Sequence, residues 1–231
     1  MAPASKRDQN PTGGIQKCQS AEPRSYAACV TSIIYGIKAN ISSGFFDGRQ
    51  FPSLEPYYID NLNCDQPPNF KLTLSKTYIK GISGFQVVQV IPNYSPYVLK
   101  LNLPKLMVSG LYDLNTQISV IPLTGKGNFI VDLNNTQAEI RVQFLKDPQG
   151  LLKIGTVETR IKFGPSKFKL TGLFGGDKAA NKLGNDVINL NPGFILDRVR
   201  PRISQHVSDT LYKIHVAIFQ GLKYEDVFPS T

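Results

Sequence analysis

Histidine is the side chain best suited to acid–base catalysis or metal binding near neutral pH, and the chain of 231 residues contains two. His206 and His215 are nine residues apart in a stretch with helical periodicity. Nine steps of about 100° put them on opposite sides of such a helix. They therefore cannot share a metal ion or act as a catalytic pair from this element. Each is interpreted as a structural or solvent-facing histidine.

No motif with the spacing of a known catalytic site is present. The sequence has no Gly-x-Ser-x-Gly elbow, no His-Glu-x-x-His pair and no Walker loop. Residues 125–128, Gly-Lys-Gly-Asn, lack the spacing of a phosphate loop and are interpreted as a hairpin turn. The carboxylates are scattered, and no two suggest a general acid and base. We expect a protein that is not an enzyme and requires no cofactor or metal; an esterase assembled from residues distant in sequence is the alternative.

Cysteine is sparse, with Cys18, Cys29 and Cys64. They include no Cys-x-x-Cys pair and are too few for a zinc site by themselves. Two interpretations stay open: three reduced thiols in a cytosolic protein, or one disulfide with a leftover thiol. The spacing of Cys18 and Cys29 would suit a disulfide that closes a small loop.

Three Asn-x-Ser/Thr sequons, at Asn40, Asn93 and Asn134, are glycosylation candidates and fit a secreted chain. The segment 1–7 lacks the apolar core of a signal peptide. If the protein is secreted, we therefore expect the numbering to begin at a mature or engineered end.

The composition indicates a soluble globular protein with a large apolar interior. Hydrophobic residues make up 41% of the chain and charged residues 19%, below the ~25% typical of soluble proteins, yet no apolar run reaches the ~18 residues of a membrane span. The net charge of +9 is not concentrated in one basic patch with interleaved aromatics. Nucleic acid is therefore not expected as a partner.

The spacing of apolar residues predicts a short helix, then many strands, then a long helix. Residues 1–16 are polar and predict a mobile tail, which leaves residues 17–231 as one domain. An i, i+3/i+4 stripe from Tyr26 to Ile41 predicts the first helix. The second stripe, from Ile203 to Ile218, predicts a helix of about five turns, with Pro201 in its first turn and Gly221 at its end.

Alternating apolar and polar residues between these helices predict an antiparallel sheet with one buried face. Clear examples are residues 71–74, 98–103, 138–144, 159–163 and 167–171. Glycine, proline and asparagine, as at Gly110 and residues 125–127, are interpreted as breaks between short strands. The order of elements predicts an α+β fold in which the long helix buries its stripe against the concave face of a curved sheet. One helix is too thin to fill that face, so an apolar cavity for a lipid is expected.

Motifs at both ends of the chain resemble one family. Residues 173–178 (Leu-Phe-Gly-Gly-Asp-Lys) and 224–229 (Tyr-Glu-Asp-Val-Phe-Pro) are similar to the closing signature of the takeout and insect juvenile-hormone-binding proteins. Towards the N-terminus, the two cysteines at the first helix, residues 52–56 (Pro-Ser-Leu-Glu-Pro) and residues 80–82 (Lys-Gly-Ile) agree. The resemblance extends from about Cys18 to Pro229.

This resemblance implies a secreted, haemolymph-type carrier with a TULIP-type fold: a highly curved antiparallel sheet around a long C-terminal helix, enclosing an elongated apolar tunnel. It implies ligands such as juvenile hormones, other terpenoids, fatty acyl lipids or carotenoids, and a disulfide between Cys18 and Cys29. The second disulfide of the hormone-binding members is missing here. That departure favours takeout-like transport over strict hormone binding.

We therefore expect a monomeric carrier of one apolar small molecule. Selectivity would come from the length and width of the tunnel, with one or two hydroxyl groups at an end. The runner-up is a module of the same fold with a filled core that binds a receptor or a membrane surface. The candidate ligand-binding residues are Ile37, Ile41, Phe45, Phe46, Phe129, Val207, Leu211, Ile214 and Ile218.

Overall fold

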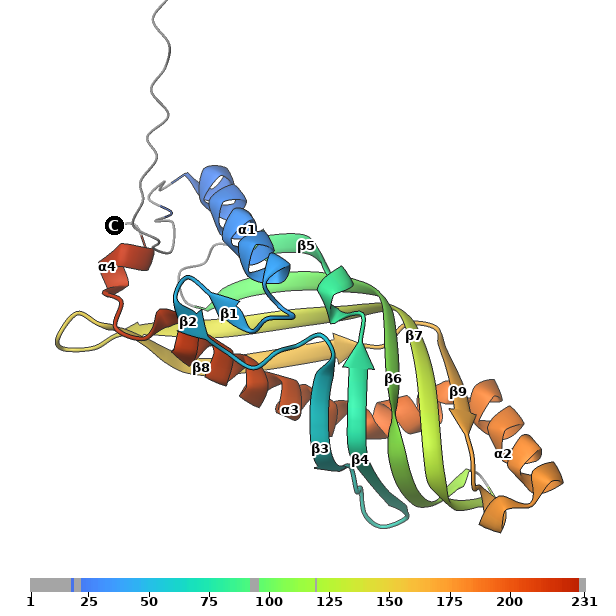
Figure 1. The fold of residues 1–231 in the computed structure, drawn as a ribbon. Helices are drawn as coiled ribbons and strands as arrows, with labels where there is room; N and C mark the ends of the chain where they lie inside the picture. The colour runs from blue at the N-terminus through green and yellow to red at the C-terminus, as the bar shows by residue number, and fades with distance from the viewer. Residues whose placement is uncertain (1–17, 19–21, 92–95, 119, 229–231) are drawn as a thin grey trace, which may run out of the picture.

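The computed structural model of the protein describes residue 18 and residues 22–91, 96–118 and 120–228. The predicted tail of residues 1–16 and the sequon at Asn93 lie outside the described residues. A helix is followed by a large sheet and then by further helices (Figure 1).

The helical elements are α1 (Pro23–Ala39), η1 (Ile82–Gly84), η2 (Phe174–Gly176), α2 (Lys178–Leu190), α3 (Pro192–Phe219) and α4 (Tyr224–Val227). The strands are β1 (Phe45–Phe46), β2 (Arg49–Gln50), β3 (Tyr57–Asn63), β4 (Phe70–Lys80), β5 (Gln86–Ile91), β6 (Tyr97–Ile118), β7 (Ile121–Lys146), β8 (Leu152–Lys162) and β9 (Ser166–Leu170).

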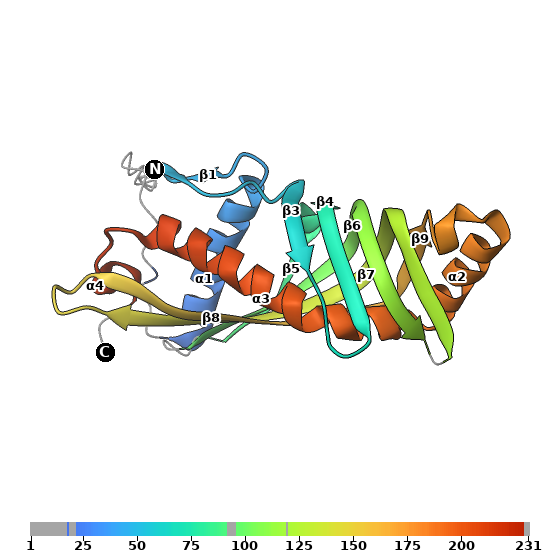
Figure 2. The same ribbon diagram turned by 90° about the horizontal axis from the view of Figure 1, so that it is seen from below.

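Strands β3 to β9 form one antiparallel sheet, and the hairpin of β6 and β7 is its central pair of strands. The strand order is β3-β4-β6-β7-β8, with β5 beside one part of β6 and β9 beside one part of β7. β6 has 22 residues and β7 has 26. Each is therefore long enough to pair with two shorter strands, one after the other: β6 with β4 and β5, and β7 with β8 and β9. The sheet curls around α3 as a result (Figures 1 and 2). The predicted α+β class, with a curved antiparallel sheet wrapping a long C-terminal helix, is confirmed.

The predicted strand breaks inside this hairpin are wrong. Gly110 lies in the middle of β6, and residues 125–128 belong to β7 rather than to a hairpin turn. A Cβ atom on Gly110 would lie 2.9 Å from the Ser75 carbonyl oxygen, and one on Gly125 would lie 2.7 Å from the Gly172 carbonyl oxygen. These glycines therefore permit a neighbouring backbone to approach closely where the sheet bends.

The long helix begins nine residues earlier than its sequence pattern indicated. Pro192, not Pro201, occupies the first turn of α3, and Pro201 lies inside the helix. The 28 residues of α3 span about 42 Å at 1.5 Å per residue, and the helix follows the length of the sheet (Figure 2). Ile195, Leu196 and Val199, before the proline, are buried. Their burial accounts for a helix that continues through Pro201, because packing outweighs the local loss of one hydrogen bond.

Candidate ligand-binding cavities

Apolar cavities lie along α3 within the described part of the chain, and a larger one lies between α1, the C-terminal half of α3 and the concave face of the sheet. Its volume is about 230 Å³. No Lys, Arg, Asp or Glu is among the described residues that line it. The principal walls are Val30, Ile33 and Ile37 from α1, Leu99, Leu101, Ile140, Val142 and Phe144 from the sheet, and Leu211, Ile214, His215, Ile218 and Phe219 from α3. A cavity of this composition suits apolar guests.

The smaller cavity, of about 100 Å³, lies beside the N-terminal half of α3. Its walls come from β4, β6, β7, β9, α2 and α3, and include Leu72, Phe129, Ile188 and Ile195. The Tyr112 hydroxyl, in the same wall, donates a hydrogen bond to the Thr171 carbonyl at 2.9 Å. Apolar contacts are therefore the main interactions that this cavity offers a ligand.

A polar cluster lies on α3 between the residues that line the two cavities. The Tyr57 hydroxyl is 3.0 Å from His206 Nε2 and 2.8 Å from Thr210 Oγ1, and the Thr210 hydroxyl donates to the His206 carbonyl at 2.9 Å. Burial lowers the pKa of His206, so its neutral form is favoured. The cluster ties β3 to the middle of α3. A single tunnel that joins the two cavities stays a prediction.

Two residues with polar side chains, His215 of α3 and Tyr97 of β6, are among those that line the larger cavity. His215 Nδ1 lies 2.7 Å from the Leu211 carbonyl, and the ring packs against both Phe144 and Phe219 at centroid distances of 6.3 and 6.0 Å. Burial lowers the pKa of His215, partly offset by the Leu211 hydrogen bond. Burial also raises the pKa of Tyr97, with a smaller contribution from Tyr26. Both side chains are therefore neutral at physiological pH.

The predicted ligand-binding residues separate into three groups. Ile37, Ile41, Leu211, Ile214 and Ile218 line the larger cavity, and Phe129 lines the smaller one. Phe45, Phe46 and Val207 line neither cavity. Phe45 is 52% exposed on β1, and Phe46 packs with Phe51 in a small apolar cluster and lies beside Gly36. The ring of Phe45 points outward because neighbouring residues of a strand face opposite sides.

Sequence reasoning missed most of the wall that the sheet and the C-terminus provide. Phe144, Phe219 and Phe228 form an aromatic group at the α4 end of the larger cavity, with Phe144 at centroid distances of 5.4 Å from Phe219 and 5.0 Å from Phe228. Two signals were available: Phe144 is an apolar member of the alternating segment 138–144, and Phe228 belongs to the closing motif of residues 224–229.

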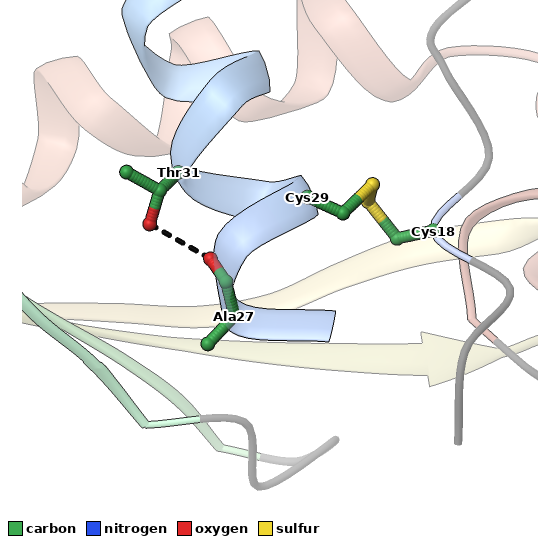
Figure 3. Close-up of a disulfide and its surroundings, with 4 residues drawn as sticks. All are labelled: Cys18, Ala27, Cys29 and Thr31. Atoms are coloured by element: carbon green, nitrogen blue, oxygen red, sulfur yellow. Dashed lines mark hydrogen bonds between the residues drawn. A yellow bond between two sulfur atoms is a disulfide. The ribbon is translucent and has the colours of Figure 1, made fainter. Parts of the chain in front are cut away.

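A disulfide joins Cys18 to Cys29 and so fixes Cys18 to α1 (Figure 3). This is the pairing that the family resemblance implied. On the same helix the Thr31 hydroxyl donates to the Ala27 carbonyl at 2.7 Å (Figure 3). Cys18 lines the larger cavity, so the disulfide holds part of that wall in place. Cys64 is a buried free thiol in the core around the other half of α3, and burial raises its pKa to about 11.

Two N-terminal motifs that were noted separately in the sequence meet in space. The Glu55 carboxylate accepts hydrogen bonds from the backbone N–H of Gly81 at 2.9 Å and of Ser83 at 2.8 Å. Gly81 has φ +98°, a conformation that favours glycine. The contact fixes η1, which carries Ile82 in the wall of the larger cavity.

The two described sequons lie at the surface. Asn40 caps the C-terminus of α1, and Asn134 is an exposed residue of β7. Within the described residues, no group of three metal-binding side chains is found. None of the described helices is long and apolar enough to cross a membrane.

A curled antiparallel sheet around a long helix, with apolar cavities along that helix, defines a lipid-binding carrier fold. The chain belongs to the haemolymph juvenile hormone binding protein family, whose model matches residues 2–229. The resemblance to takeout and juvenile-hormone-binding proteins is thereby confirmed, and members of this family are binding proteins.

Similar proteins agree with this assignment. Two are circadian clock-controlled proteins named daywake, from Drosophila yakuba (23% identity) and Drosophila melanogaster (24% identity). Each match covers 78% of this chain and 75% of the relative. The crystal structure of Takeout 1 from Epiphyas postvittana has the same fold, with a TM-score of 0.74 at 19% identity, over 93% of this chain and 99% of that one.

Proposed function

We propose that this protein is a secreted, non-enzymatic carrier that holds an elongated hydrophobic molecule inside the sheet. The observation that carries the proposal is the cavity of about 230 Å³ lined almost wholly by apolar side chains. Membership of a family of haemolymph binding proteins supports both the carrier role and secretion. Extracellular disulfide chemistry agrees with the bond between Cys18 and Cys29.

Burial of apolar surface supplies the binding free energy. Covering about 300 Å² of ligand at ~25 cal/mol per Å² gives roughly 7 kcal/mol before ordering costs are subtracted. An apolar cavity of about 150 Å³ holds one benzene molecule, which has six carbons, and the cavity here has a volume of about 230 Å³. A terpenoid or fatty acyl chain of ten or fewer carbons therefore matches the cavity best, and a carotenoid would require the two cavities to join.

The same observation favours a carrier over the two alternatives. A module with a filled core would leave no cavity of this size, because protein interiors are close-packed. An esterase needs a nucleophile activated by a base within hydrogen-bond reach, and no Ser or Thr is among the described residues that line the larger cavity.

Native mass spectrometry of protein purified without detergent tests the proposal. We expect a bound lipid in the wild type and its loss in Leu211→Trp, because an indole at this half-buried wall of α3 fills the cavity. The matched control is Leu183→Trp on α2, where the side chain is 60% exposed. A wild type that takes up no lipid from vesicles or solution, or a Leu211→Trp variant that binds as the wild type does, contradicts the proposal.

A further inference from the structure

The apolar stripe of α3 passes from the smaller cavity to the larger one. Ile203 lines the smaller cavity and Leu211 lines the larger one. Val207 is midway between them, about 6 Å from each along the helix axis at 1.5 Å per residue. A step of four residues turns the helix direction by only about 40°, so the Val207 side chain points between the other two. Val207 is half-buried and lines neither cavity, so on the helix it separates the two linings.

The concave face of the sheet shows the same interruption. On β6 the residues that line the larger cavity end at Leu101, and those that line the smaller one begin at Val108. On β7 the corresponding limits are Ile140 and Leu133. The inward-facing residues between these limits, which line neither cavity, are Leu103, Leu106, Thr136 and Ala138. We refer to Val207 and these four residues as the partition, because they separate the linings of the two cavities.

The partition coincides with the place where both long strands exchange partners. β6 pairs with β5 up to Asn102 and with β4 from Met107 onwards. β7 pairs with β9 up to Leu133 and with β8 from Gln137 onwards. Only β6 and β7 therefore continue from one half of the sheet to the other, and the two cavities lie on either side of this exchange.

The strand register and two hydrogen bonds place Val207 level with this exchange. Tyr57 of β3 lies opposite Ile79 of β4, and Ile79 lies opposite Val108, the residue at which the lining of β6 resumes. The Tyr57 hydroxyl bonds at 3.0 and 2.8 Å to two side chains on the turn of α3 that carries Val207. This turn is therefore tied to the sheet, and widening the partition requires a smaller side chain or the loss of these bonds.

We propose that Val207 limits the length of the bound ligand, because its side chain closes the larger cavity towards the smaller one. The proposal rests on the carrier function proposed above. An extended chain buries methylene groups until it meets Val207, and any further carbons stay outside. Each buried methylene raises the affinity about fourfold, whereas one left outside adds nothing. A cavity of about 150 Å³ holds the six carbons of benzene, so the volume of about 230 Å³ places the limit at about ten carbons.

Straight-chain alcohols from hexan-1-ol to dodecan-1-ol test this limit by isothermal titration calorimetry of the full chain. We expect wild-type affinity to rise about fourfold per methylene up to about ten carbons and to change less than twofold beyond. Val207→Ala removes two carbons from the partition. It should bind dodecan-1-ol at least fivefold more tightly than the wild type does, with hexan-1-ol affinity within twofold. The matched control is Val216→Ala on the same helix, where the side chain is 40% exposed; it should reproduce the wild type at every length.

The ¹³C methyl resonances of Ile203 give an independent readout, because Ile203 lines the smaller cavity. Dodecan-1-ol should shift them in Val207→Ala and leave them unchanged in the wild type. Equal affinity of the wild type and Val207→Ala for dodecan-1-ol, or wild-type affinity that rises without a limit along the series, overturns the length limit alone. Failure of every alcohol to bind the wild type overturns the carrier function as well. If Val207→Ala does not fold, the wild-type series and the Ile203 spectrum decide the question.

Discussion

Asn185 of α2 pairs with the backbone of Leu170 as a neighbouring strand would. The Leu170 N–H donates to Asn185 Oδ1 at 2.8 Å, and Asn185 Nδ2 donates to the Leu170 carbonyl at 2.9 Å. Asn189 makes the same two bonds to Phe168. Four residues of helix advance about 6 Å and two residues of strand about 6.6 Å. A helix can therefore cover the free edge of β9 with asparagines four residues apart, which protects that edge from pairing with another chain.

Asn185→Leu should lower the free energy of unfolding by about 2 kcal/mol. The change keeps the approximate size of the side chain but leaves the Leu170 N–H without a partner and removes the shorter of the two hydrogen bonds to its carbonyl, which keeps only the one from Asn181 Nδ2. Urea unfolding followed by circular dichroism measures the effect. Asp186→Leu, at an exposed position of the same helix, should change stability by less than half as much. Equal effects of the two substitutions would show that the backbone pairing contributes little.

Gly110→Ala should destabilise the sheet by roughly 1–3 kcal/mol, the usual cost of overpacking. Its new methyl group would lie 2.9 Å from the Ser75 carbonyl oxygen and from Thr77 Cα, so the two strands would have to separate. Gly84→Ala is the control, since its methyl group would meet nothing within 4 Å. Thermal unfolding of the two variants compares them. A Gly110→Ala variant as stable as Gly84→Ala contradicts the close approach of β4 and β6.

The stability of the protein should fall as the pH drops below about 6.5. Burial lowers the pKa of His215 and of His206 in the folded state, whereas the unfolded chain titrates near 6.5. The unfolded state therefore binds protons first, and acid shifts the equilibrium towards it. Above that pH both histidines are neutral in the folded and in the unfolded state, so they no longer lower the stability.

Urea unfolding between pH 5 and pH 8 measures this dependence, and histidine NMR titration of the folded protein locates the two pKa values. The slope between pH 5 and pH 6.5 should decrease in His215→Phe, which removes one titrating group. An unchanged slope in this variant would assign the dependence to other groups.

Cys18→Ser/Cys29→Ser should lower the free energy of unfolding by about 3 kcal/mol, since the disulfide closes a loop with a sequence separation of 11. Dithiothreitol should destabilise the wild type by a similar amount and leave the double variant unchanged. Affinity for an apolar probe should also fall in the double variant, because Cys18 belongs to the wall of the larger cavity. A reductant effect that persists in the double variant would place its origin elsewhere.

The sequence by itself determined the elements and the family. Period-two alternation marked the strands, the stripe from Ile203 to Ile218 marked the long helix, and the terminal motifs identified the family, because these are local patterns of residue type. Local patterns also misplaced the start of α3 at Pro201 and read Gly110 as a break. In both cases long-range packing outweighed the local preference of the residue.

Only the tertiary structure decided which side chains face a cavity. Ile37, on one helix, and Leu211, on another, line the same space, whereas Val207, one turn from Leu211 on the same apolar stripe, does not. Contacts between elements distant in the chain set this difference, and no spacing in the sequence encodes it. The same holds for His215 and Tyr97, which lie on α3 and β6, far apart in the chain, and line the same cavity.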